Sequence, residues 1–147
     1  MPDQSFRRVL VAIACAAALL GAGCSGDDET ETYREDLTEA KEEFDGVLKS
    51  AAASSQTPEG IERDIDRLRA GIAEFKEKLR DLDPPEEAEN EQRALNEALA
   101  DYDDAVGATK AAIQGDDKKA VVAEVARMRT TGAALDQALE TLVAAVE

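Results

Sequence analysis

Histidine and tryptophan are absent from this chain of 147 residues, and cysteine occurs only twice, as Cys15 and Cys24. Without histidine the chain has no Ser-His-Asp or Cys-His nucleophile system and no histidine-ligated metal site. Because both cysteines lie near the N-terminus, a zinc-cysteine cluster or a disulfide within the remaining sequence is also excluded. These absences remove most of the familiar catalytic arrangements.

Basic residues are scarce as well. The chain has 17 Lys and Arg against 33 Asp and Glu, which gives a formal net charge of −16. A charge of this sign repels phosphate backbones, so nucleic acid is not an expected partner. The length is that of one ordinary domain.

The N-terminal segment has the layout of a signal peptide. Arg7 and Arg8 precede an uncharged apolar run over 9–20, and small residues follow it. The strongly apolar part is shorter than the roughly 17 to 25 residues that a membrane-spanning helix needs. A cleaved signal therefore fits better than a permanent anchor.

The residues Leu20-Gly21-Ala22-Gly23-Cys24 resemble the lipobox of bacterial lipoproteins, although Leu20 lies one position earlier than the family's usual leucine. The resemblance implies cleavage between Gly23 and Cys24 and a diacylglycerol on Cys24, which would anchor the chain to the outer face of the cytoplasmic membrane. Two acyl chains hold a protein stably without a polybasic patch. Two alternatives stay open, an ordinary signal peptide with an incidental Cys24 and an uncleaved anchor.

The sequence after Cys24 divides into a short polar part and a long helical part. Residues 24–32 are small, polar and acidic, which predicts a flexible tether after the lipidated cysteine and the 1–23 signal peptide. Over 33–147 the apolar residues recur at alternating steps of four and three, the a/d heptad of helices that pack along one seam. The seams cover 33–54, 61–82, 88–113 and 121–146.

Residues that cap or end helices separate these seams. Thr57-Pro58 and Asp83-Pro84 each combine a capping side chain with a proline suited to the first helical position, and Glu86 completes a capping box. The segment 115–117, Gly-Asp-Asp, ends one helix and offers two caps for the next. The helices are expected at about 30–55, 58–82, 84–114 and 117–146.

Short connections bring consecutive helices alongside one another, so the expected fold is all-α, an antiparallel up-down four-helix bundle with coiled-coil-like heptad seams. The same heptads would also permit two long hairpins that dimerise, but a monomer is favoured over a homodimer. The fourth helix is expected to be the most buried, because Ala133, Ala134 and Ala138 lie beside its seam.

The densest acidic clusters, 86–91 and 101–104, could in principle hold a hard cation such as Ca²⁺. The EF-hand pattern is absent, and a solvated helix face explains the clusters better. No metal and no cofactor is therefore expected. Glycines within the predicted helices, Gly46, Gly71, Gly107 and Gly132, indicate either close helix approach or a cavity for an apolar ligand.

From end to end the chain resembles the small Ala- and Glu-rich helical lipoproteins, of uncharacterised activity, of high-GC Gram-positive bacteria. The resemblance rests on Leu20 to Cys24, the acidic segment after it, and Leu82-Asp83-Pro84-Pro85 before a long helix. It implies an envelope location but no established activity. Taken together, the sequence favours an exported, lipid-anchored, non-enzymatic helical module that binds another envelope component, such as an envelope protein, or acts as a spacer. The alternative is a binding protein for a small apolar ligand or a divalent cation.

Overall fold

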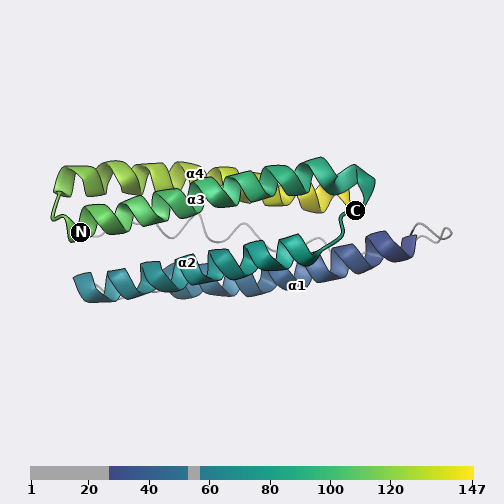
Figure 1. Cartoon of the computed structure of the whole chain (residues 1–147), viewed down its shortest axis with the longest axis horizontal. Coiled ribbons are helices and arrows are strands. Elements are labelled where there is room, and N and C mark those ends of the chain that lie inside the picture. Colours follow the sequence, from purple (N-terminus) through teal and green to yellow (C-terminus); the bar gives the residue numbers. More distant parts are fainter. Residues whose placement is uncertain (1–26, 53–56) are drawn as a thin grey trace, which may run out of the picture.

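The computed structural model describes residues 27–52 and 57–147, which form four long α-helices and one short 3₁₀ helix (Figure 1). In chain order the elements are α1 (Asp27–Ala52), α2 (Pro58–Asp81), the 3₁₀ helix η2 (Glu86–Ala88), α3 (Glu89–Gln114) and α4 (Lys118–Ala145). Within these described residues there is no strand. The cysteines, the signal segment and the cleavage site lie outside the described residues.

The helices run alternately up and down as two hairpins, α1 with α2 and α3 with α4, stacked as two layers (Figure 1). The closest packing is between α3 and α4, and α2 joins the layers by packing on α3. The expected four-helix bundle is confirmed. We call the end where α1 begins and α2 passes into α3 the linker end, and the end where α1 leads to α2 and α3 to α4 the turn end.

The heptad seams form the core as predicted. Every seam residue whose burial the structure describes is buried or half-buried, and none is exposed. The most completely buried large side chains are Leu37, Ile72, Phe75, Leu79, Leu95, Leu99, Val106 and Leu142. The 3.5-residue period therefore identified the inward face of every helix.

Two predicted helix starts are confirmed. The Thr57 hydroxyl accepts a hydrogen bond from the Gly60 N–H at 3.2 Å, with proline at the next position. Asp117 Oδ1 accepts from the N–H groups of Lys119 and Ala120, both at 3.0 Å. The turn before Asp117 places Asp116, not a glycine, in the left-handed region at φ 50°, a conformation that Asp tolerates better than most residues.

The prediction of a flexible tether over 24–32 is wrong for residues 27–32, because these residues form the first turns of α1. Their acidic side chains lie at the positive end of the helix dipole, where negative charge is stabilising. The Thr32 hydroxyl also donates to the Asp28 carbonyl at 2.8 Å. The helical domain thus begins at Asp27, three positions after Cys24.

The start of the third helix is also corrected. Residues 82–85 are not helical, with Leu82 and Pro85 extended, Asp83 makes no capping bond, and η2 begins only at Glu86. A residue before a proline is disfavoured in the α region, so Pro84 and Pro85 oppose a helical conformation at Asp83 and Pro84. The Asp83-Pro84-Pro85 sequence therefore ends one helix without starting the next.

The expectation that α4 is the most buried helix is wrong. Its buried residues within the helix are Leu135, Leu139 and Leu142, and no residue from Lys118 to Ala134 is fully buried. Ala133 and Ala134 are exposed. Alanine favours a helix through its propensity whether or not it is covered, so an alanine-rich stretch does not by itself indicate burial.

Candidate functional site

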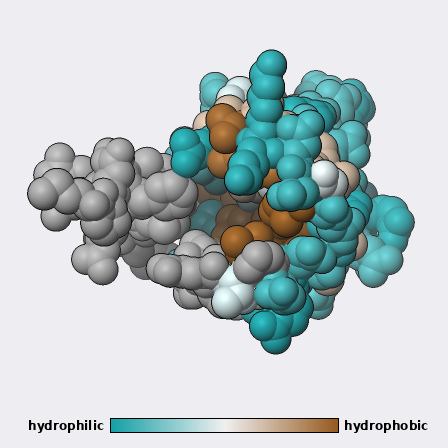
Figure 2. Space-filling model, turned by 90° about the vertical axis from the view of Figure 1, so that its left-hand side faces the viewer, coloured by the Kyte–Doolittle hydropathy of each residue, from teal (hydrophilic) through white to brown (hydrophobic). Residues whose placement is uncertain are grey.

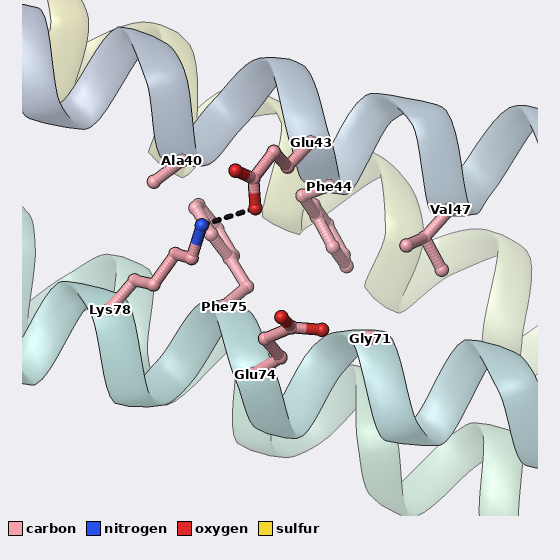
Figure 3. Close-up of a pocket in the computed structure, with 8 residues that line it drawn as sticks. All are labelled: Ala40, Glu43, Phe44, Val47, Gly71, Glu74, Phe75 and Lys78. Atoms are coloured by element: carbon pink, nitrogen blue, oxygen red, sulfur yellow. Dashed lines mark hydrogen bonds and ion pairs between the residues drawn. The ribbon is translucent and has the colours of Figure 1, made fainter.

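A groove runs along the outer face of the hairpin formed by α1 and α2. Its narrower part has a volume of about 90 Å³ and is lined by eight residues (Figure 3). A wider, more open part of about 310 Å³ continues toward the linker end, between Asp36 and Leu82. Both parts are lined by Ala40 and Lys78, so the two hollows adjoin one another. Together we call them the α1/α2 groove.

The floor of the narrower part is apolar and tightly packed. Phe44 of α1 and Phe75 of α2 stack with ring centroids 4.7 Å apart and planes 5° apart (Figure 3). Each ring is almost fully buried, and such a pair contributes about 0.5–1.5 kcal/mol beyond its burial. The groove is therefore a preformed feature of the hairpin.

Gly71 allows the two helices to approach closely beside this pair. A Cβ added at Gly71 would lie 2.5 Å from Cγ1 of Val47, closer than carbon atoms can approach. Close helix approach is therefore the role of this glycine, one of the two roles expected from the sequence. At Gly46 an added Cβ would meet nothing within 4 Å, so neither role applies there.

The rim of the groove is acidic except for one ammonium group. Lys78 forms an ion pair with Glu43 across the groove, from α2 to α1 (Figure 3). The hydrogen bond to Glu43 raises the pKa of Lys78, and the nearby charges of Glu74 and Glu39 act in the same direction. Five carboxylates line the groove in all, those of Asp36, Glu39, Glu43, Glu74 and Asp81.

This rim belongs to a strongly acidic surface. Helix α1 carries ten acidic and three basic residues, whereas α4 carries three acidic and four basic ones. Of the four α-helices, α1 is the most negative and α4 the only one with a positive balance. One wall of the groove is thus formed by α1, the helix that attracts cations most strongly.

The acidic clusters considered as cation sites are not assembled into one. Asp103 is paired with Arg69, Nε to Oδ1 at 2.8 Å, and Asp101 and Asp104 are exposed. Glu86 and Glu87, in η2, are exposed. Across residues 27–52 and 57–147 no group of three or more candidate ligands could hold a metal ion.

Gln92, one of two buried polar residues in the third seam, forms a junction between three helices. Gln92 of α3 accepts a hydrogen bond from the Tyr33 hydroxyl of α1 at 2.5 Å, and its amide donates to the Leu79 carbonyl of α2 at 2.9 Å. Burial raises the pKa of Tyr33 to about 12, which keeps the hydroxyl protonated and donating. This geometry fixes the register of the helices, the commoner use of a polar seam residue.

The groove was missed in the sequence because its apolar lining residues are ordinary seam positions. The available signal was Gly71 within a helix, which indicated close approach without identifying the partner residue. Cys24 and Gly23, the predicted lipidation and cleavage residues, lie outside the described residues.

Among the described helices, none is long and apolar enough to cross a membrane. No protein-family model matches the chain, and neither the curated proteins nor the solved structures contain a match to it.

Proposed function

We propose that this chain is an exported, lipid-anchored, non-enzymatic helical module that binds another component of the cell envelope. The observation that carries the proposal is the position of Cys24, after the apolar run and its three small residues and three positions before α1. A lipid on Cys24 would then be joined to the bundle almost without a spacer. The absence of histidine supports a non-enzymatic role.

This attachment would orient the bundle. The linker end, where α1 begins, would face the membrane, and the turn end would lie away from it. A helix of 26 residues is about 39 Å long at 1.5 Å per residue. The α1/α2 groove, on the side of the rod between these ends, would remain open to partners outside the membrane.

Replacing Cys24 tests the anchor. We expect Cys24→Ala to move the protein from the membrane fraction to exported soluble material, or to block processing, because the mature chain then has no other thiol to receive the lipid. The matched control is Cys15→Ala, which removes the thiol within the apolar run and should leave the protein on the membrane. A Cys24→Ala protein that is processed and still sediments with membranes would contradict the proposal.

A further inference from the structure

The α1/α2 groove is long enough to hold a short peptide segment. Its lining extends along α1 from Asp36 to Val47, which is about 17 Å of helix. That length matches about five residues of an extended chain at 3.3 Å each. The Lys78–Glu43 ion pair spans the depression.

The narrow part of the groove is small for a free ligand. Its volume of about 90 Å³ is well below the roughly 300 Å³ at which pockets for drug-sized ligands begin, and below the 150 Å³ of a cavity that binds benzene. A single aliphatic side chain of a larger partner suits it better. The preformed floor of Phe44, Phe75 and Val47 would remove that side chain from water.

The rim selects the charge of that partner. Five carboxylates line the groove, and the Lys78 ammonium is the single positive group among its lining residues. A partner carrying Lys or Arg around its apolar side chain is attracted, while an acidic partner is repelled. Lys78 already occupies Glu43, so it competes with any incoming cation at that carboxylate.

We infer that the α1/α2 groove binds a basic protein segment that places one apolar side chain over Phe44 and Phe75 while its cations pair with Glu39 and Glu43, and that Lys78 is an internal competitor for this contact. The inference names the partner's chemistry for the module proposed above, and it rests on that proposal only for where the groove is presented. Its test needs no lipid anchor, so its failure is distinguishable from failure of the anchoring proposal.

The test uses the full chain in a neutral detergent and two synthetic peptides of 12 residues. Both peptides carry the same number of lysines, and they differ only in a central Leu or Ser. Affinity is measured by calorimetry near physiological ionic strength, where long-range attraction is screened beyond about 8 Å. We expect the Leu peptide to bind one to one and several times more tightly than the Ser peptide.

Charge variants locate the contact. Glu39→Gln with Glu43→Gln should weaken the Leu peptide about five- to tenfold, whereas Glu86→Gln with Glu87→Gln changes the net charge equally at η2 and should leave affinity almost unchanged. Lys78→Gln should tighten binding by freeing Glu43. Equal losses from the two glutamate pairs, equal affinity for the two peptides, weaker binding by Lys78→Gln, or no binding of either peptide would each overturn the inference.

Discussion

The two ends of the bundle use the same heptad pattern and reach different degrees of burial. At the linker end Leu79, Leu95, Leu99 and Leu142 have no exposed surface. Toward the turn end the seams also hold residues that are only half-buried, among them Val47, Ile61, Ile113, Val121 and Val125, although Ile65 and Thr109 are buried. Seen from the turn end, apolar side chains are visible between the hydrophilic surfaces of the two hairpins (Figure 2). A heptad pattern therefore defines the inward face of a helix without defining how well that face is covered.

The difference has a structural cause in the connections. At the linker end η2 packs against both α3 and α4, and its Ala88 is completely buried. The Tyr33–Gln92–Leu79 junction ties α1, α2 and α3 together at the same end. The seams there are mainly leucine, which fills more volume than the valines of α4 at the turn end. The linker end is thus closed by both packing and hydrogen bonding.

The largest expected effect compares a charge buried at each end. Leu135→Asp, at a seam position with 2% exposure on α4, should cost at least about 3 kcal/mol, because the carboxylate would be buried without a partner. Val125→Asp on the same helix is half-buried and should cost about 1 kcal/mol. Urea unfolding followed by circular dichroism measures both. Equal losses would mean that the turn end is as closed as the linker end.

A second prediction concerns the junction. Gln92→Ala should reduce the free energy of unfolding by about 2–3 kcal/mol, because it leaves the Tyr33 hydroxyl and the Leu79 carbonyl without their partners. Tyr33→Phe removes one hydrogen bond and should cost about 1 kcal/mol. If Gln92→Ala were as stable as the parent in the same urea experiment, hydrogen bonding would not explain the closure of this end.

Most of the fold was predictable from the sequence because its signals are local. The seam period identified the core residues, and the caps at Thr57 and Asp117 follow from side chains within three residues of the groups they bind. Two wrong predictions concern competing local preferences. At 27–32 the charged side chains favour a helix start through the helix dipole, against the disorder expected of a polar segment. At 84–88 the two prolines oppose the helix start that a capping box would favour. The burial of α4 was wrongly predicted because alanine content alone does not distinguish a helix that forms through high propensity from one that is buried.

The groove was less predictable because it depends on two helices at once. The approach of Gly71 to Val47 requires a specific register of α1 on α2, and the ion pair of Lys78 with Glu43 spans 35 positions in the sequence. A pattern along one helix contains no information on these pairings. The lipobox-like residues are readable only as sequence, and Cys24 stays a prediction.

Two glycines on the same hairpin test whether looseness toward the turn end extends to the contact of α1 with α2. Gly71→Ala should destabilise the bundle by about 1–3 kcal/mol, because the new methyl group would overlap the side chain of Val47. Gly46→Ala meets open space and should stabilise it by about 0.5–1 kcal/mol through helix propensity. The two melting temperatures should move in opposite directions. A stabilising Gly71→Ala would indicate that α1 and α2 are free to separate.

The smallest expected effect concerns Asp136 of α4, whose carboxylate interacts electrostatically with Asp45 and Lys41 of α1. Burial, followed by the charges of Glu140 and Asp45, raises the pKa of Asp136 above 3.8, while Lys41 lowers it. Because the folded pKa is above the unfolded one, ionised Asp136 destabilises the bundle at neutral pH, and the penalty disappears as the pH falls through the raised pKa toward 3.8. Asp136→Asn should therefore raise the melting temperature slightly at pH 7, with the gain shrinking steadily in acid. Lys41→Gln, which removes the compensating charge, should enlarge the gain from Asp136→Asn at pH 7. A gain independent of pH would show that Asp136 acts through packing, and the contact between the layers would then not be limited by charge.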